Sequence, residues 1–294
     1  MEMHQLRYFA KVAELGNVTR AAEACGVSQP SLSQQVAKLE RELGLPLLER
    51  LGRGVRLTAA GTVFREYAAQ ILALAEQART RVADEPDRGK LTVAAIPTVA
   101  PYFLPGVLTA FAVECPHATL DIVEETTGRI AQMIAVGEVD LAFVASGELG
   151  DSVHVEPLFT EELLAVLPEA HPLAAAPKVS LKDLAETRFV LLNEAHCLTG
   201  NAVSFCTRHA VTPIATARTH QIATVLELVR LGHGVSLVPA MAAAGGHPGC
   251  AFRPLRGVPP VRTVSVAWGK TRYKTRLFNR FLAALKRNPA SQER

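Results

Sequence analysis

Two cysteines, Cys197 and Cys206, flank one short segment that follows an apolar run at residues 189–192. If Cys197 begins a helix, its thiolate lies among unpaired backbone amides at the positive end of the helix dipole, with His196 beside it. That setting can lower the pKa of a thiol and raise its reactivity toward oxidants. The residue types of this segment therefore fit a redox sensor.

The spacing of the two cysteines restricts what they can do together. They lie nine positions apart, which in an intact helix is a rise of about 13 Å, whereas a disulfide tolerates Cα separations of only up to about 7 Å. Any bond between them would require the segment to refold. The alternative is that both are small buried apolar residues, as most free cysteines are. Spacing alone favours that alternative, and because no paired cysteine motif is present we expect no metal site.

The composition bounds the class of protein. The chain has 294 residues, enough for two domains, and with 49% hydrophobic and 20% charged residues it resembles an ordinary globular protein. The N-terminus does not resemble a signal peptide, and no apolar run reaches the ~20 residues of a membrane span, so we expect no membrane partner. Five cysteines without an export signal predict free thiols in a reducing cytoplasm. The net charge of +3 is too small to establish a nucleic-acid partner by itself.

Residues 1–60 have the pattern of a compact helical unit. After a first helix, Asn17 and Thr19 are candidate N-caps for a second helix, which Gly26 ends. Ser28 is placed to cap a third helix that has Pro30 in its first turn, where a missing N–H costs nothing. Two short helices around a Gly-containing turn predict a helix-turn-helix, whose recognition helix enters the major groove of DNA.

The third helix separates its residues into two faces. Spacings of i, i+4 and i+7 turn Leu32, Val36 and Leu39 inward. The outward face is polar, and it comprises Gln29, Ser31, Ser33, Gln34 and Lys38. Gln can pair with adenine edges, Ser with several bases, and Lys with guanine or phosphate. The outward face therefore has the residue types of a surface that reads bases.

A predicted hairpin at residues 48–57 follows, with a turn at Gly52-Arg53-Gly54. Arg50, Arg53 and Arg56 form a local basic cluster on it, which could reach the DNA backbone or minor groove as a wing. A solvated face is the alternative for these arginines, because up to residue 66 nine Lys and Arg stand against seven acidic residues. The order of turn, cap, polar face and wing favours DNA contact.

The rest of the chain predicts a long helix and then an α/β domain. Thr58 is placed to cap a helix running to about residue 82, and residues 85–90 are polar with Pro and Gly, as in a hinge. From residue 91 strands and helices alternate, which predicts a parallel sheet with helices on both faces and a second lobe after it. The expected strands are 91–95, 120–123, 141–144, 163–167, 189–192 and 235–238, and the main helices are 101–111, 127–136 and 222–231. A ligand is expected in a cleft between the lobes.

Two segments resemble a known family. The stretch VTRAAEACGVSQPSLSQQVAKLERELGLPLLER at residues 18–50 and RLTAAG at 56–61 are similar to the DNA-binding domain of LysR-type transcriptional regulators. The resemblance implies an N-terminal all-α winged helix-turn-helix at residues 1–60, a dimerising linker helix at 58–84, a hinge at 85–90, and at 91–294 a C-terminal α/β two-lobed regulatory domain similar to periplasmic binding proteins. It also implies double-stranded promoter DNA as a partner, a tetramer built as a dimer of dimers, and contact with RNA polymerase. The expected DNA contacts are Arg20, Gln29, Pro30, Ser31, Ser33, Gln34, Lys38, Arg50 and Arg53.

Within that family, IPTVAPYFLP at residues 96–105 and LLNEAHCLTGNAVSFC at 191–206 resemble the peroxide-sensing OxyR subgroup. The resemblance implies that Cys197 reacts with hydrogen peroxide and that Cys206 then closes a disulfide, which reverses the preference given by spacing alone. It also implies that Thr98, Thr127 and His196 hold peroxide by hydrogen bonds, although taken singly each threonine equally fits a plain helix cap. One departure is Gly200, where the subgroup often has an acidic residue.

The sequence therefore predicts a cytoplasmic transcriptional regulator, of the activator type, that senses peroxide and needs no cofactor. The first alternative is a regulator of the same family that binds a small metabolite in the cleft between its lobes. The second is a thiol peroxidase, which is disfavoured because a catalytic cycle gains nothing from a DNA-reading domain. We accordingly expect no enzymatic activity.

Overall fold

The computed structural model describes residues 1–51, 54–82, 88–145, 149–185, 187–193, 197–208 and 214–287. It divides into two compact units. The first comprises Met1–Asp84 with Ala135–Glu138, and the second comprises Glu85–Ile134 with Val139–Arg294. In the part of the chain so described, no helix is both long enough and apolar enough to cross a membrane.

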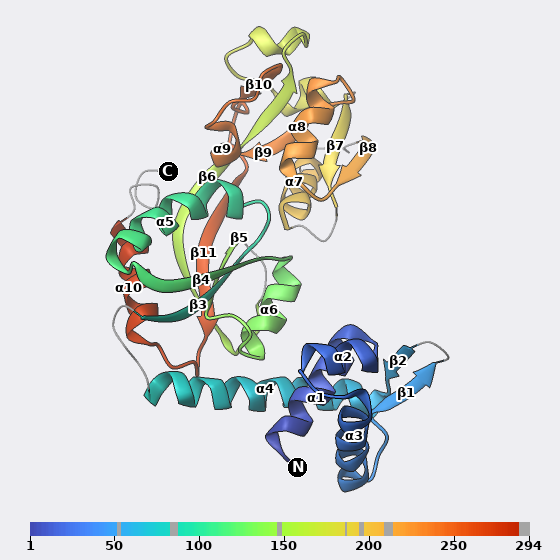
Figure 1. Ribbon diagram of the computed structural model, residues 1–294. Coiled ribbons are helices and arrows are strands. Elements are labelled where there is room, and N and C mark those ends of the chain that lie inside the picture. Colours follow the sequence, from blue (N-terminus) through green and yellow to red (C-terminus); the bar gives the residue numbers. More distant parts are fainter. Residues whose placement is uncertain are drawn as a thin grey trace. The chain divides into compact units, whose positions relative to one another are not determined.

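Three helices open the first unit (Figure 1): α1 (Met3–Leu15), α2 (Val18–Ala24) and α3 (Gln29–Leu43). Two predicted caps are confirmed, because the Asn17 side chain accepts a hydrogen bond from the Arg20 amide at 3.0 Å and the Ser28 hydroxyl accepts one from the Ser31 amide at 3.4 Å. The inward face of α3 is confirmed as well. It joins α1 and α2 in one core that includes Leu6, Phe9, Val12, Leu32, Val36 and Leu39.

A hairpin and a long helix complete this unit: β1 (Leu48–Leu51), β2 (Gly54–Leu57) and α4 (Ala59–Val82). Thr58 caps α4 as predicted, since its hydroxyl accepts from the Gly61 amide at 2.9 Å and donates to the Pro46 carbonyl at 2.7 Å. A Cβ atom at Gly61 would lie 2.0 Å from the Leu47 carbonyl oxygen, so α4 can approach the base of the hairpin only with glycine there. The predicted turn residues Gly52 and Arg53 lie outside the described residues.

Helix α4 carries apolar side chains that its own unit does not cover. Val63, Tyr67 and Leu74 are 58%, 60% and 67% exposed, whereas Ala68 is fully buried in the core of the unit. Spacings of four and seven positions place these three side chains on one side of the helix.

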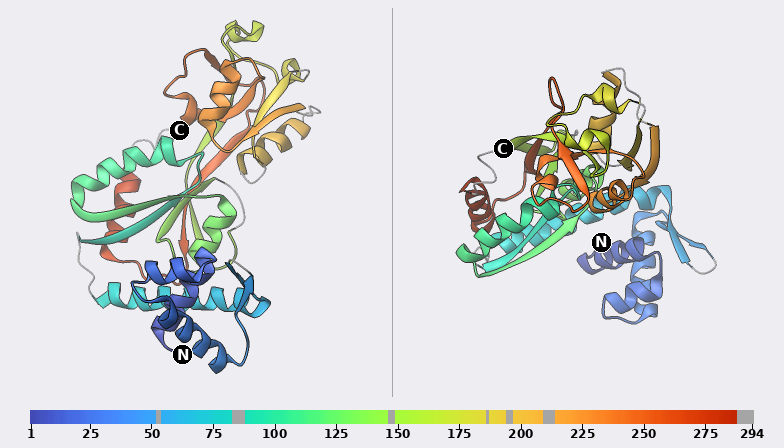
Figure 2. Two further views of the ribbon diagram at one scale, coloured as in Figure 1. Left: turned by 45° about the vertical axis from the view of Figure 1, so that its right-hand side comes forward. Right: turned by 90° about the horizontal axis from the view of Figure 1, so that it is seen from above.

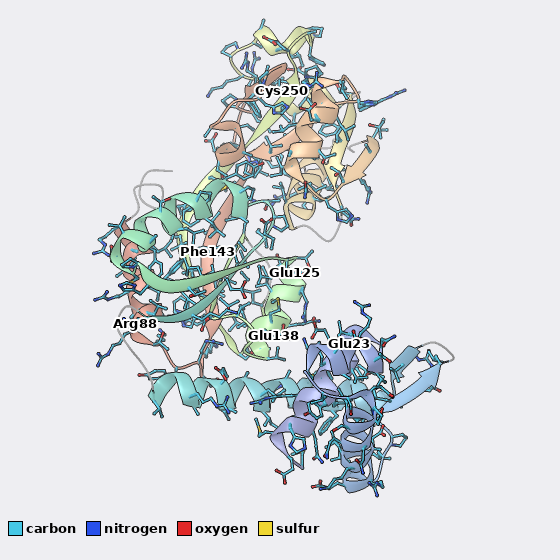
Figure 3. The ribbon with its side chains drawn as sticks, viewed as in Figure 1. Glu23, Arg88, Glu125, Glu138, Phe143 and Cys250 are labelled. Atoms are coloured by element: carbon cyan, nitrogen blue, oxygen red, sulfur yellow. The ribbon has the colours of Figure 1, made fainter. Side chains whose placement is uncertain are left out.

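The second unit opens with the predicted strand-helix alternation: β3 (Arg88–Ala95), α5 (Ala100–Glu114), β4 (His117–Glu124), α6 (Thr127–Ala135) and β5 (Leu141–Ala145). β3 pairs in parallel with both β4 and β5. Helices α5 and α6 lie on opposite faces of these strands (Figures 1 and 2), as right-handed crossovers in opposite directions require. The helix α10 (Arg276–Arg287) packs beside α5, and Phe143 of β5, labelled in Figure 3, lies fully buried beneath them.

Two long strands make the sheet mixed, so the prediction of a parallel sheet is wrong here. β6 (Val153–Pro168) and β11 (Val261–Gly269) pair antiparallel to each other, and β11 is antiparallel to β5. The predicted strand at 163–167 is only the end of β6. The earlier part of β6 contains Glu156, Glu161 and Glu162, so it lacks the apolar run by which a buried strand is recognised.

β6 continues from the first lobe into the second, where it pairs with β9 (Ser236–Pro239) and β10 (Cys250–Arg253). The rest of the second lobe is formed by η1 (Pro172–Ala175), η2 (Leu181–Leu184), β7 (Arg188–Leu192), α7 (Cys197–Arg208), β8 (Ile214–Thr219), α8 (Ile222–Arg230) and α9 (Ala240–Ala243). β7 and β8 are parallel. The strands β8, β10 and β11 are not predicted from the sequence.

Two apolar cores flank β7, because successive side chains of a strand point to opposite faces. Phe189 and Leu191 belong to one core, and Val190 and Leu192 belong to the other. Helix α7 is described from Cys197, the position at which the sequence allows a helix start.

Candidate functional site

The predicted threonines lie at the carboxyl ends of two neighbouring strands. Thr98 follows β3, and Thr127 follows β4 as the first residue of α6. We call residues 96–98 and 125–127 the carboxyl edge. The connections from β3 to β4 and from β4 to β5 leave in opposite directions around β3. In open α/β sheets ligands bind outside the carboxyl ends of the strands at such a point.

Thr98 is anchored by an arginine from the far end of the chain. Its side chain is buried, its hydroxyl oxygen accepts a hydrogen bond from Arg262 Nη1 at 2.8 Å, and its carbonyl accepts one from Nη2 at 3.0 Å. Because Arg262 donates to this oxygen, the hydroxyl proton of Thr98 points away from the guanidinium and is available to donate. Thr98 is therefore not the plain helix cap that the sequence also allowed.

Arg262 is itself fixed by a buried carboxylate. Its Nε donates to Glu161 Oε1 at 2.9 Å, and the two residues are 2% and 3% exposed. The other carboxylate oxygen accepts the Met241 amide at 2.9 Å, next to the start of α9. A buried charge is tolerated when it is paired and hydrogen-bonded in this way. The pair holds Thr98 on a rigid support in which the arginine charge is neutralised.

Tyr102 lies close to the same arginine, at the start of α5. Its ring packs against the core of the first lobe and against one core of the second. Burial raises the pKa of its phenol above the usual value, although the nearby Arg262 charge acts in the opposite direction. The phenol therefore stays protonated at neutral pH and can donate a hydrogen bond.

Thr127 has the opposite environment from Thr98. Its hydroxyl oxygen is buried and has no hydrogen-bond partner among the described residues. Buried hydroxyls are normally paired, because leaving one unpaired costs about 1–3 kcal/mol. An unpaired hydroxyl at the carboxyl edge therefore marks a place where a small polar molecule could bind.

The two cysteines differ in what the structure describes. Cys206 is a free thiol, 1% exposed, in the core that contains Phe189 and Leu191. Burial raises the pKa of its thiol from the ordinary 9.0 to about 11. His196 and the side chain of Cys197 lie outside the described residues, but the backbone of α7 is helical from Cys197 onward. The nine-position separation is therefore spanned by helix.

The first unit presents most of the expected DNA-contact residues at its surface. On α3, Gln29, Pro30, Ser31, Gln34 and Lys38 are exposed and Ser33 is half-buried, and Arg20 of α2 is exposed. The amide of Gln29 donates to the Ser33 hydroxyl at 3.0 Å. Arg53 and the side chain of Arg50 lie outside the described residues, and Arg56 forms a surface ion pair with Glu49 at 2.8 Å.

Sequence reasoning missed the supports of both sites. Gln35, between the outward residues of α3, is held by Gln5 and His4 of α1 at 3.2 and 3.1 Å. Arg262 and Glu161 were not predicted either. The available signal was a lone arginine inside the apolar stretch VRTVSVAW, where a charge requires a buried partner.

Comparison with known proteins extends over both units. Residues 3–62 match the family model described as bacterial regulatory helix-turn-helix protein, lysR family, and residues 84–290 match the LysR substrate binding domain. The chain is 30% identical over 272 residues to the hydrogen peroxide-inducible genes activator of Pectobacterium carotovorum subsp. carotovorum, which covers 91% of this chain and 90% of that protein.

Two solved structures are similar over nearly their whole length. A full-length OxyR from Pseudomonas aeruginosa with a cysteine-to-aspartate substitution has a TM-score of 0.79 and 29% identity, covering 100% of this chain and 99% of that one. A cysteine-to-serine mutant of Corynebacterium glutamicum OxyR with hydrogen peroxide bound has a TM-score of 0.64 and 31% identity, covering 98% and 92%. The predicted fold class, a winged helix-turn-helix with a linker helix followed by a two-lobed α/β domain, is confirmed. The chain belongs to the LysR family of bacterial regulatory helix-turn-helix proteins.

Proposed function

We propose that this protein is a DNA-binding transcriptional regulator that senses hydrogen peroxide through oxidation of Cys197 and disulfide formation with Cys206. The observation that carries the proposal is the pair of hydroxyls at the carboxyl edge. The hydroxyl oxygen of Thr127 is buried without a partner among the described residues, and Thr98 has its proton available to donate. The likeness to a peroxide-inducible activator and to a peroxide-bound OxyR supports the same assignment.

The charge of the carboxyl edge favours a neutral ligand over an anionic metabolite. Arg262, the cation that touches Thr98, is already paired with Glu161. Four of its five N–H groups bond to Glu161, Thr98 and the Met241 sulfur. A carboxylate ligand would need an uncommitted cation, whereas hydrogen peroxide needs only small donors and acceptors, which hydroxyls supply.

The proposed reaction has two balanced steps. The thiolate of Cys197 attacks one oxygen of peroxide, an S–O bond forms as the O–O bond breaks, and the departing hydroxide takes a proton to leave as water. We assign His196 to supply that proton and Thr98 and Thr127 to orient the peroxide. The sulfur of Cys206 then attacks the sulfenic sulfur, an S–S bond forms as the S–O bond breaks, and a second water leaves with the Cys206 proton.

For the DNA-contact unit we propose base reading by α3 and phosphate contact around it. Gln29, Ser31, Ser33 and Gln34 would read base edges, because their side chains both donate and accept. Arg20, Pro30, Lys38, Arg50 and Arg53 would position the unit on the backbone. The exposed apolar side chains of α4 support dimerisation through that helix. The tetramer and the contact with RNA polymerase remain predictions.

The test is thiol trapping on the full-length reduced protein before and after one equivalent of hydrogen peroxide, followed by peptide mass spectrometry. We expect a disulfide between Cys197 and Cys206, and in a Cys206→Ser variant a sulfenic acid at Cys197 that a dimedone-type probe traps. Cys115→Ser is the matched control, since Cys115 is also buried and should not affect the response. Absence of the disulfide, together with a shift in DNA binding caused by a small metabolite, would favour the metabolite-binding alternative. Turnover of peroxide with a dithiol reductant would instead indicate an enzyme.

A further inference from the structure

Helix α7 is attached to its lobe at two places that belong to different cores. Leu198, near its start, packs in the core that contains Val190 and Leu192. Phe205 and Cys206, near its end, pack in the core on the opposite face of β7. Since a bond between Cys197 and Cys206 requires the helix to open, one of these attachments has to be released first.

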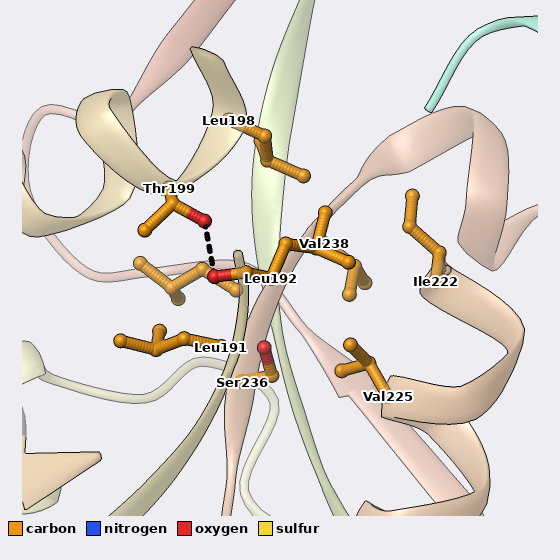
Figure 4. Close-up of a pocket in the computed structure, with 9 residues that line it drawn as sticks. Leu191, Leu192, Leu198, Thr199, Ile222, Val225, Ser236 and Val238 are labelled. Atoms are coloured by element: carbon orange, nitrogen blue, oxygen red, sulfur yellow. Dashed lines mark hydrogen bonds between the residues drawn. The ribbon is translucent and has the colours of Figure 1, made fainter. Parts of the chain in front are cut away.

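The first turn of α7 has the features of a weak attachment. Leu198 and Thr199 border a cavity of about 10 Å³, whose other walls include Ile222, Val225 and Val238 (Figure 4). A space of this size holds about one water molecule, so the packing under the first turn is incomplete. The neighbouring Gly200 is exposed, and a Cβ atom built there would meet nothing within 4 Å. Gly200 is therefore not required by close packing, and its effect is to weaken the helix.

One buried hydrogen bond acts against this weakness. The Thr199 hydroxyl donates to the carbonyl oxygen of Leu192, the last residue of β7, at 2.9 Å (dashed in Figure 4). Thr199 and Leu192 are both 5% exposed. If Thr199 loses this bond while the helix stays docked, the Leu192 carbonyl is left buried without it, which destabilises the docked state.

We propose that Thr199 is a latch and Gly200 a weak point that together set how readily the first turn of α7 opens, and hence how fast Cys206 closes the disulfide on oxidised Cys197. This inference rests on the proposed function. Release of the latch frees Cys197, Leu198 and Thr199 to move toward the Cys206 end, which stays packed on its core. Thr199 is thus a positioning residue, because it acts through the placement of Cys197 rather than on peroxide itself.

The test uses full-length variants of the reduced protein. Thr199→Val keeps the shape and the modest helix propensity of threonine but removes the hydroxyl, so it should speed disulfide closure about 3- to 10-fold, the factor that corresponds to a net hydrogen bond. Thr199→Ser restores a donor and should return closure toward the wild-type rate. Gly200→Ala should slow closure about 4- to 5-fold, because alanine stabilises a helix relative to glycine.

A control variant removes a similar hydrogen bond that lies within α7 and does not join the helix to β7. The Thr207 hydroxyl donates to the Val203 carbonyl at 2.9 Å within α7 and is exposed. Thr207→Val should therefore leave the closure rate close to that of the wild type. Closure is measured by rapid mixing with excess peroxide, acid quenching and alkylation, and the sulfenic acid step is followed separately with a dimedone-type probe.

Amide hydrogen exchange on the reduced variants gives a readout that does not depend on peroxide. Protection across residues 197–203 should fall in Thr199→Val and rise in Gly200→Ala. The latch is wrong if the wild type closes the disulfide but Thr199→Val closes it no faster than Thr207→Val. If the wild type itself forms no disulfide, the proposed function fails and the latch fails with it. Gly200→Ala keeps the proposal testable even if Thr199→Val folds poorly, since the alanine should make α7 more stable.

Discussion

Helices α3 and α7 have similar lengths but are anchored in opposite ways. α3 is capped by Ser28 at its start and by Gly44, with φ of 72°, at its end, and its inward residues all join a single core. α7 divides its buried residues between two cores and contains Gly200 in its first turns. Burial alone therefore does not keep a helix folded. A helix attached to one core is lost only with that core, whereas a helix attached to two can give up one attachment and keep the other.

The difference fits what each helix has to do. A surface that reads bases must keep its side chains in a fixed geometry, because each bidentate base contact depends on direction. A segment that joins two thiols nine positions apart must be able to lose its helical rise and form again. The proposed function therefore requires that α3 stays folded and that α7 can unfold and fold again.

The largest expected effect is at the start of α7. Cys197→Ser should abolish the peroxide response completely, because a serine hydroxyl stays protonated at neutral pH and is a poor nucleophile. Affinity of the reduced protein for promoter DNA should be unchanged, since α3 belongs to a separate compact unit. The measurement is DNA binding with and without peroxide, with Cys250→Ser as the control. A Cys197→Ser protein that still responds would contradict the sensing mechanism.

The next effect tests whether α3 is anchored by a single core. Leu32 is fully buried in the single core of the first unit. Leu32→Ala should lower the free energy of unfolding of that unit by about 2–5 kcal/mol and weaken DNA binding, while oxidation of Cys197 proceeds normally. Lys38→Ala on the exposed side of the same helix should stay within about 0.5 kcal/mol of the wild type. Chemical denaturation monitored by circular dichroism measures both, and equal losses for the two variants would argue against a single-core anchor.

A smaller effect separates base reading from phosphate contact. Gln34→Ala should relax the choice of base at one position, at about 1–3 kcal/mol for a lost bidentate contact. Arg53→Ala should weaken binding to all sequences alike and flatten the dependence of affinity on salt, because fewer counterions are released. Binding isotherms on specific and random duplexes at several salt concentrations distinguish the two. Identical losses on both duplexes for both variants would remove α3 as the reading surface.

How much of each region can be predicted from the sequence depends on how far apart in the chain its contacting residues lie. The caps, faces and bounds of α1 to α3 depend on neighbours within a few positions, so Ser28, Pro30 and the Leu32 spacing predict them. The support of Thr98 depends on Arg262, which is 164 positions away, and on Glu161, which is 101 positions from Arg262. No local sequence pattern predicts that these residues come together. The family resemblance identifies Thr98 as a site residue but does not identify Arg262 or Glu161.

Two single residues show the same limit. Gly61 belongs to the recognisable RLTAAG segment, but the sequence does not show why glycine is required there. In the structure, a Cβ atom at this position would lie 2.0 Å from the Leu47 carbonyl oxygen. Gly200 stands out in the sequence as the loss of an acidic residue. In the structure a side chain at this position would meet open space, so glycine is not needed for packing. Its effect is to lower the stability of the helix.

The smallest expected effect concerns the pH dependence of α7. Burial raises the pKa of the Cys206 thiol from 9.0 to about 11, so the docked helix favours the neutral thiol. The stability that this contributes is fully present below pH 9 and is lost as the pH rises through about 11, because the released thiol ionises more readily than the docked one. At neutral pH Cys206 therefore stays a neutral thiol while it is packed in its core, and it loses its proton only as it attacks the sulfenic sulfur.

This effect can be measured by hydrogen exchange of the reduced protein between pH 8 and about 11, with each rate normalised to that of an unfolded peptide to remove base catalysis. Protection near the end of α7 should decline over that range in the wild type and should not decline in Cys206→Ala, which has no group to ionise. Helix α3 contains no cysteine and serves as the internal reference. If α3 and α7 lose protection in parallel, the decline reflects the whole protein rather than the thiol. If Cys206→Ala behaves like the wild type, burial of Cys206 does not control the opening of α7, and the two helices differ for some reason other than the way their ends are anchored.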